Sequence, residues 1–108
     1  MQFNIEETLT GMLSAMKLVA SDHWKDVEAV SRNFYNRKKE RLEMIAKMRI
    51  SGELSQAKFE SRLEDEKLIL EAEINALAVL SKAITQKAVN AAMDVLQKSV
   101  EKIIDGVL

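Results

Sequence analysis

The sequence predicts an all-α protein: a long antiparallel helical hairpin that pairs with a second hairpin into a four-helix bundle. Three observations lead to this prediction. The 108 residues contain no proline and only three glycines, so few positions would break a helix. Apolar residues recur at helical spacing along most of the chain. Finally, signals for a helix end and a helix start meet near the middle, at residues 51–55.

The first predicted helix covers residues 4–50. Asn4 has the side chain of a helix N-cap. Ser21 or Asp22 could also cap a new helix, so a break near these residues stays open as an alternative to one continuous helix. The apolar stripe of this arm comprises Ile5, Leu9, Met12, Met16, Val19, Trp24, Val27, Val30, Phe34, Leu42, Ile45 and Met48.

Residues 51–55 form the predicted bend of the hairpin. Gly52 can adopt the left-handed conformation that closes a helix at low steric cost. Ser55 is a good N-cap for the next helix, and Leu54 and Phe59 have the spacing of a hydrophobic staple. Because the end and start signals are so close, we expect a tight turn between two antiparallel helices.

The second predicted helix covers residues 56–105 and ends at Gly106. The two arms are nearly equal, and each would be roughly 70 Å long if straight. In the register that the bend sets, Met12 lies opposite Asp94 and Val95. We expect the whole chain to form one domain. The apolar stripe of this arm comprises Phe59, Leu63, Leu70, Ile74, Leu77, Ile84, Ala88, Ala91, Val95 and Ile103.

Toward the two termini the apolar faces become wider than one partner helix can cover. A two-helix hairpin would therefore leave a large apolar patch in water. We expect a second copy to cover it, giving a homodimer with coiled-coil-like packing. The alternative is a three-helix monomer in which a break near Ser21 folds the first segment back. The predicted self-association residues are Met12, Met16, Val19, Trp24, Leu77, Leu80, Ile84, Ala91 and Val95.

A basic segment, residues 32–49, carries seven lysines and arginines against two glutamates. Residues 50–73 carry seven acidic residues against three basic ones. Because the bend folds one segment onto the other, we expect them to neutralise each other, with Arg41 facing Asp65. Glu66 and Glu73 are expected near the seam, where they could pair with Lys38 or Arg37. The alternative is a nucleic-acid-binding protein whose contacts are Arg37, Lys38 and Arg41.

Side chains that carry chemistry are sparse. The absence of cysteine excludes disulfides, thiolate catalysis and cysteine-bound metals. His23 is the only histidine and does not belong to the Glu-x-x-His pair of a di-iron bundle, so we expect it on the surface. No serine lies in a Gly-x-Ser-x-Gly motif, and no glycine-rich loop could hold a phosphate. We expect a protein that is not an enzyme and binds no metal or cofactor, with Trp24 as a core anchor.

Two partial resemblances concern the shape of the hairpin. The segment "MIAKMRISGELSQAKFESRL" resembles the short two-helix modules found at the carboxyl termini of bacterial proteins, with a Gly-x-Leu-Ser bend followed by Phe-Glu. The overall length and hairpin shape also resemble the small helical substrates of type VII secretion. Those substrates have Trp-x-Gly at the bend, where this chain has Ile50-Ser51-Gly52. Neither resemblance implies a function here.

The amino-terminal residues and the hydropathy pattern predict a soluble, cytoplasmic protein. Two early glutamates, with no leading lysine or arginine, are the opposite of a secretory signal. The longest apolar run, residues 76–80, is far short of the ~20 residues that span a bilayer. We therefore expect no membrane partner. The predicted function is a self-associating structural or interaction protein that scaffolds or binds another macromolecule, with an unknown protein as partner.

Overall fold

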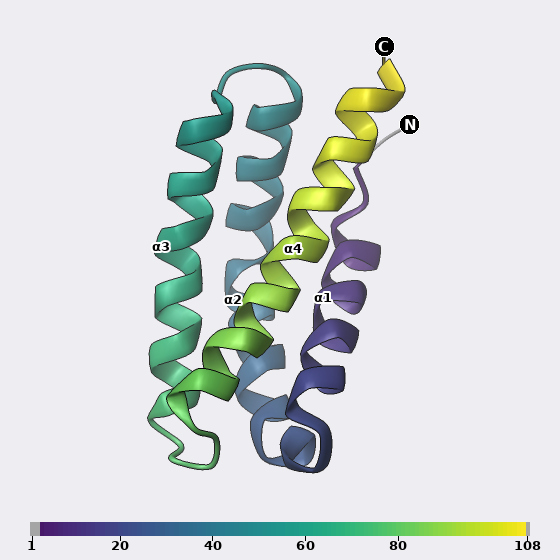
Figure 1. Ribbon diagram of the computed structural model, residues 1–108. Coiled ribbons are helices and arrows are strands. Elements are labelled where there is room, and N and C mark those ends of the chain that lie inside the picture. Colours follow the sequence, from purple (N-terminus) through teal and green to yellow (C-terminus); the bar gives the residue numbers. More distant parts are fainter. Residues whose placement is uncertain (1–2, 108) are drawn as a thin grey trace.

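The chain folds into a bundle of α-helices, which confirms the predicted all-α class (Figure 1). The computed structural model describes residues 3–107. Within that range there is no strand, and a single 3-10 turn joins the first two helices. The elements are α1 (Ile5–Ala20), the 3-10 turn η1 (Ser21–His23), α2 (Trp24–Ile50), α3 (Gln56–Asn75) and α4 (Lys82–Val107).

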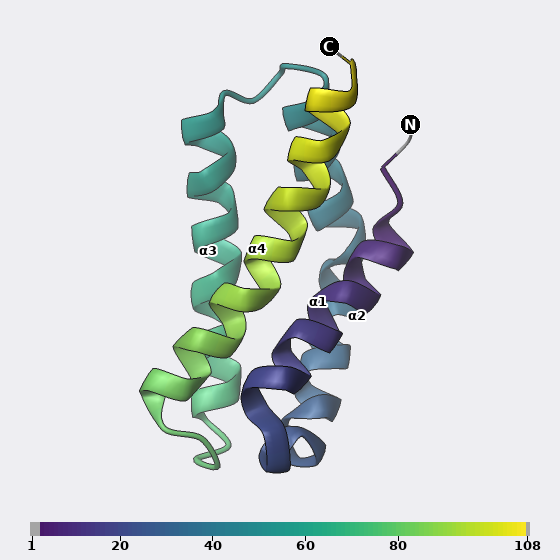
Figure 2. The ribbon, with the colours of Figure 1, turned by 45° about the vertical axis from the view of Figure 1, so that its right-hand side comes forward.

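Successive helices run in opposite directions, as two views of the ribbon show (Figures 1 and 2). α1 packs most extensively on α4, α2 lies beside both α1 and α3, and α3 lies beside α4. The bend between α2 and α3 lies at the same end as the start of α1 and the end of α4. η1 and residues 76–81, which join α3 to α4, lie together at the opposite end. We call this opposite end the hinge end.

The bend at residues 51–55 forms as predicted. Gly52 has a φ of 86°, in the left-handed region that favours glycine. The Ser55 hydroxyl accepts a hydrogen bond of 3.2 Å from the backbone N–H of Lys58, so Ser55 caps α3. Leu54 and Phe59 are both buried, as the predicted staple requires.

The first arm breaks near Ser21, which was one of the two alternatives that the sequence left open. Asn4 caps α1 as predicted, because its Oδ1 accepts a hydrogen bond of 3.0 Å from the Glu7 backbone N–H. At the other end of α1, Ser21 has a φ of 53°. Such a conformation costs a residue with a side chain about 1–3 kcal/mol. α2 then runs back along α1, and the Tyr35 hydroxyl donates a hydrogen bond of 3.2 Å to the Met16 sulfur.

The prediction of one continuous helix over residues 56–105 is wrong. α3 ends at Asn75, and residues 76–81 turn the chain back before α4 begins. α4 then continues through Gly106 to Val107, so the predicted end at Gly106 is also wrong. No glycine or proline occurs in the turn. The helical periodicity therefore runs straight through it, and the sequence pattern hides the turn.

Two local features build the turn between α3 and α4. Ala78 has a φ of 57°, a left-handed conformation that alanine rarely adopts. Ser81 then caps α4, because its hydroxyl accepts a hydrogen bond of 3.2 Å from the Ile84 backbone N–H. The burial of the apolar faces of α3 and α4 against the rest of the bundle compensates for the strained alanine.

The bundle is therefore the predicted hairpin folded in half. The molecule measures 43 × 22 × 21 Å, much shorter than the predicted straight arms. The predicted register between α1 and α4 is kept to within one residue. Met12 was expected opposite Val95, and it is Gly11 that lies against Val95, where an added Cβ atom would be 3.1 Å from Val95 Cγ1. Most of each wide apolar face is covered within one chain, and the four helices of the bundle come from a single copy. The three-helix alternative is wrong because the second arm turns as well as the first.

Tyr35, the only tyrosine, lies in the centre of this core. Its ring meets the Phe34 ring edge-on, with the centroids 5.5 Å apart. Burial raises the pKa of the Tyr35 phenol well above its ordinary value of 10.0, because the phenolate would lose its hydration. The folded protein should therefore keep the phenol proton in alkaline solution while the unfolded chain loses it.

The stability of the fold is expected to decrease above pH 10 because of Tyr35. Above that pH the folded state binds one proton more than the unfolded state, so the free energy of unfolding falls by about 1.4 kcal/mol per pH unit. Denaturant unfolding of the wild type and of Tyr35→Phe between pH 9 and 11.5 isolates this slope from that of the lysines. Phenolate absorbance that develops fully in the folded protein near pH 10 would contradict the expected burial.

Candidate interaction surface

A layer of ion pairs joins α2 to α3 beside the apolar core. Arg37 donates hydrogen bonds of 2.6 and 2.8 Å to the two carboxylate oxygens of Glu73. Glu66 is buried, and Arg41 donates a hydrogen bond to it from one side. On the other side the Lys38 ammonium lies 3.3 Å from the second Glu66 oxygen. Two cations thus share one buried carboxylate.

These pairs confirm that Glu66 and Glu73 lie at the seam and pair with Lys38 and Arg37. The expected partner of Arg41, Asp65, is wrong by one residue. Asp65 is exposed, whereas Glu66 stands on the buried face of α3 beside Arg41. The residues proposed from the sequence as nucleic-acid contacts thus each lie against a glutamate of α3.

The other four cations of the basic segment also have polar partners. Lys39 pairs with Glu6 of α1, which ties α2 to α1. The Arg32 and Lys47 side chains each pair with a glutamate four residues earlier in α2. Arg49 donates a hydrogen bond of 3.0 Å to Gln56 across the bend. The segment therefore carries its positive charge next to compensating groups.

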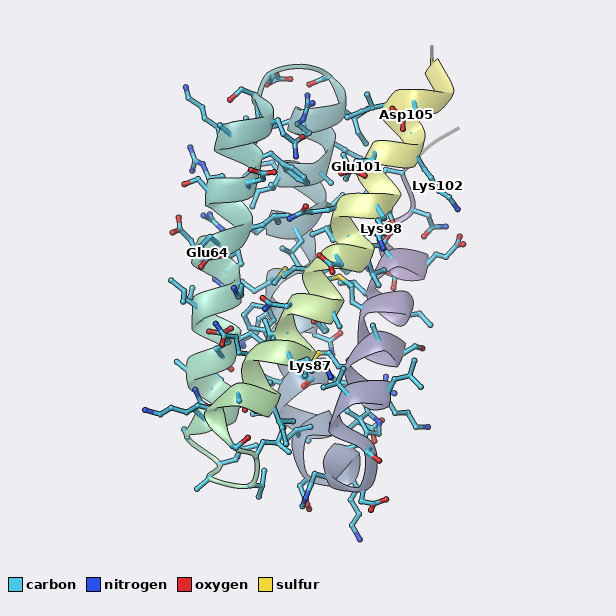
Figure 3. All side chains as sticks on the ribbon, viewed as in Figure 1. Glu64, Lys87, Lys98, Glu101, Lys102 and Asp105 are labelled. Carbon is cyan, nitrogen blue, oxygen red and sulfur yellow. The ribbon has the colours of Figure 1, made fainter. Side chains whose placement is uncertain are left out.

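The outer surface of α4 mixes both signs of charge. Figure 3 shows Lys98, Glu101, Lys102 and Asp105 following one another along the carboxyl-terminal part of α4, and all four are exposed. Such a face is solvated and has no large field of one sign.

The structure brings no reactive side chains together in a catalytic arrangement within residues 3–107. His23 is exposed, as expected, and its Nδ1 lies 3.9 Å from an Asp26 carboxylate oxygen. Across the described residues, no group of three or more histidines, aspartates and glutamates could hold a metal ion. Trp24 is buried, as predicted for a core anchor.

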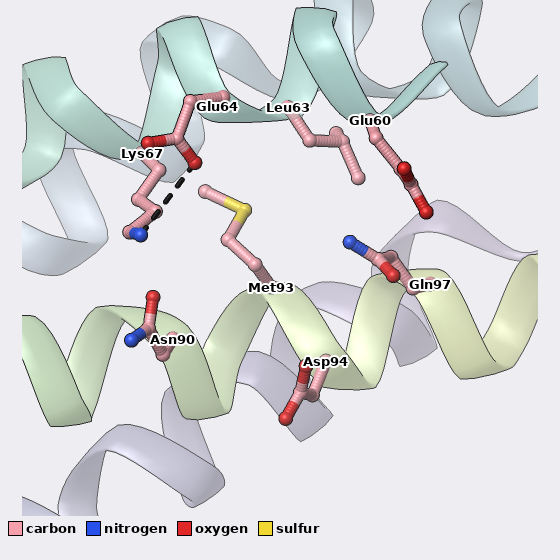
Figure 4. Close-up of a pocket in the computed structure, with 8 residues that line it drawn as sticks. All are labelled: Glu60, Leu63, Glu64, Lys67, Asn90, Met93, Asp94 and Gln97. Carbon is pink, nitrogen blue, oxygen red and sulfur yellow. Dashed lines mark ion pairs between the residues drawn. The ribbon is translucent and has the colours of Figure 1, made fainter. Parts of the chain in front are cut away.

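A cleft of about 280 Å³ lies between α3 and α4. Figure 4 shows polar side chains from both helices around it, with Leu63 of α3 and Met93 of α4 extending into the space between the helices. The ion pair drawn there, Lys67 with Glu64 at 3.5 Å, lies within α3. In the described part of the chain, no hydrogen bond or ion pair crosses from α3 to α4. Contact between α3 and α4 at this cleft therefore comes from apolar side chains such as Leu63 and Met93.

The predicted self-association residues fall into three groups in the structure. Met12, Met16 and Trp24 are buried inside the chain's own core, where a second copy cannot reach them without rearrangement. Leu77 and Ile84 are exposed, at 39% and 41% of their surface. The half-buried residues are Val19, Leu80, Ala91 and Val95.

The two exposed residues belong to a larger apolar group at the hinge end. Val79 lies in the turn between α3 and α4 and is 37% exposed. Leu18, in the last turn of α1, is 84% exposed. We call these four residues, Leu18, Leu77, Val79 and Ile84, the apolar end. Leu18 and Val79 belong to the wide apolar faces of the two arms but were not among the predicted self-association residues. The sequence signals for their exposure are the helix break near Ser21, which ends α1 just after Leu18, and the Ser81 N-cap, which begins α4 just after the turn that holds Val79.

No protein-family model, curated protein or solved structure matches this chain. Among the helices of residues 3–107, none has the length and apolar character needed to cross a bilayer. The cytoplasmic location expected from the sequence stays a prediction.

Replacing the buried carboxylate with Glu66→Ala is expected to lower the free energy of unfolding by about 2–3 kcal/mol, because two cations at the seam lose their shared partner. Glu73→Gln is the matched control in α3. Its ion pair is more exposed, so that change should cost under about 1 kcal/mol. Urea denaturation measures both, and equal losses would show that burial does not set the strength of these pairs.

Proposed function

We propose that this chain is a non-enzymatic structural protein that self-associates through its hinge end and so scaffolds another protein. The observation that carries this proposal is the apolar run of residues 76–80, which forms an exposed turn. Turns normally consist of glycine, proline, asparagine, aspartate and serine, whose backbone and side-chain properties suit solvent. Residues 76–79 are exposed and Leu80 is half-buried, and four exposed apolar residues in one turn are unexpected unless another surface covers them.

The neighbourhood of the turn supports a protein partner. Leu18 is almost fully exposed at the same end of the bundle, although a leucine side chain gains about 1.5–3 kcal/mol when it is fully buried. Charged residues of both signs are exposed in the elements at the hinge end, among them Asp22 in η1, Lys25 at the start of α2 and Lys82 at the start of α4. Protein interfaces usually combine exposed apolar residues with charged and polar ones.

A second copy of the chain is the occupant that this end fits best. The net charge is only −1, so two copies do not repel one another strongly. A surface that carries both signs of charge can complement itself across a two-fold axis.

The nucleic-acid alternative is less well supported. Binding to phosphates relies on cations that are free to replace counterions. In this chain Arg37, Lys38 and Arg41 already lie against α3 glutamates, and part of the Lys38 side chain is covered. A non-enzymatic role is favoured because the cleft between α3 and α4 lacks an arranged nucleophile and base.

Leu77→Glu is expected to raise the dissociation constant of the dimer at least about tenfold, since a charge would have to be buried in the interface. Leu68→Glu is the matched control, because Leu68 is exposed but lies in the middle of α3. Light scattering over a dilution series measures the mass of each variant. The proposal fails if the wild type has the mass of one chain at every concentration, or if Leu68→Glu weakens association as much as Leu77→Glu.

A further inference from the structure

The bundle consists of two halves that meet at two hinges. The terminal half is α1 with α4, which form the most extensive helix contact in the molecule. The bend half is α2 with α3, joined by residues 51–55 and by the ion pairs of Glu66 and Glu73. Both connections between the halves, η1 and residues 76–81, lie at the hinge end (Figures 1 and 2). The two halves are therefore joined covalently at one end of the bundle only.

Polar links between the two halves are few. On one side Lys39 pairs with Glu6, and the Tyr35 hydroxyl donates to the Met16 sulfur. On the other side the cleft between α3 and α4 is lined mainly by polar side chains, as Figure 4 shows. The contact between the halves therefore relies on apolar packing, which another copy of the same surface would provide equally well.

Both hinges hold a residue in a conformation that its side chain disfavours. Ser21 has a φ of 53° and Ala78 a φ of 57°, and neither is glycine. Within residues 75–84, Asn75 and the α4 cap Ser81 are the only residues that favour a turn over a helix. Straightening each hinge into a helix would relieve both strained residues.

The exposed apolar residues of the second hinge continue a buried stripe. Ile74 before the turn and Ala88 after it are buried, whereas Leu77 and Ile84 between them are exposed. In one continuous helix these four positions, spaced by three, seven and four residues, would lie on one face. A straight helix would thus align the exposed residues with the core stripe on each side.

We infer that the chain opens at both hinges and exchanges halves with a second copy. In the resulting dimer, the terminal half of each chain packs on the bend half of the other. The hinges become continuous helix, and each chain takes the form of the long hairpin. This inference rests on the proposed self-association and gives its mechanism.

The exchange keeps the core packing of the closed chain. Contacts between α1 and α4, and between α2 and α3, stay within one chain, while those between the halves re-form between chains. The dimer gains the relief of both hinges and the burial of Leu77 and Ile84. The closed chain avoids the entropic cost of association, so protein concentration sets the balance.

Cross-linking of engineered cysteines tests the exchange. The chain has no cysteine of its own, so an introduced pair holds the only thiols. Glu6→Cys with Lys39→Cys places one thiol on each half, at positions whose native side chains are in contact. After separation of monomer and dimer by gel filtration, a short bismaleimide should give covalent dimers from the dimer fraction. The monomer fraction should give only cross-links within one chain.

Arg37→Cys with Glu73→Cys is the matched control, because both positions lie in the bend half. This pair should cross-link within one chain in both fractions. A dimer fraction in which the Glu6→Cys/Lys39→Cys pair links only within one chain would overturn the exchange while leaving self-association intact. The absence of any dimer fraction would instead overturn the proposed function.

A glycine substitution tests the role of the hinge directly. Ala78→Gly fits the left-handed conformation without strain and weakens a continuous helix, so the dissociation constant of the dimer should rise at least about tenfold. Ala72→Gly is the control, since Ala72 is an exposed residue of α3 that stays helical in both forms. Equal dissociation constants for these two variants would contradict opening at the second hinge.

Discussion

The width of the apolar faces on the two predicted arms is the constraint on which the whole structure depends. When two helices pack together, each covers only one narrow apolar stripe of the other, and the apolar faces of α1 and α4 are wider than one stripe. A second layer of helices is therefore required. The chain supplies this layer itself by turning both arms back at the same level, which places α1 and α4 on α2 and α3.

The charge pattern fits this arrangement and restricts its register. Glu66 is buried where Arg41 and Lys38 can both reach it, and a shift of α3 along α2 would leave that carboxylate unpaired. Gly11 has a similar effect on the other pair of helices. The close approach of Val95 to its Cα leaves little room for a larger side chain at that level. The ion pairs of Glu66 thus restrict the register of α2 and α3 in the bend half, and the tight contact between Gly11 and Val95 restricts the register of α1 and α4 in the terminal half.

Much of this fold could be predicted from residues whose physical preferences are strong and local. Gly52, Ser55 and the Leu54–Phe59 staple define the bend, and Asn4 defines the start of α1. The predicted register follows from the bend alone. The turn at residues 76–81 could not be predicted, because alanine, leucine and valine there continue the helical pattern, and only tertiary packing forces Ala78 into a positive φ.

The candidate surface was only partly predictable for the same reason. Periodicity selects apolar positions but cannot say which helix covers them, so Met12 and Leu77 look alike in the sequence. The structure places Met12 in the core and leaves Leu77 exposed. The difference arises at the hinge end, where the stripe of α3 leaves the helix and the bundle has no further element to cover it. The residues that local rules fail to place are thus those on which the proposed self-association depends.

Small-angle X-ray scattering of the dilute protein tests the central claim, that one chain folds in half to cover its own apolar faces. A compact particle is expected at the lowest concentration, with a radius of gyration near the 13.8 Å of the Cα atoms and a longest dimension close to 43 Å plus its hydration layer. A rod of roughly 70 Å with the mass of one chain would contradict it, since that particle would be the straight hairpin standing alone.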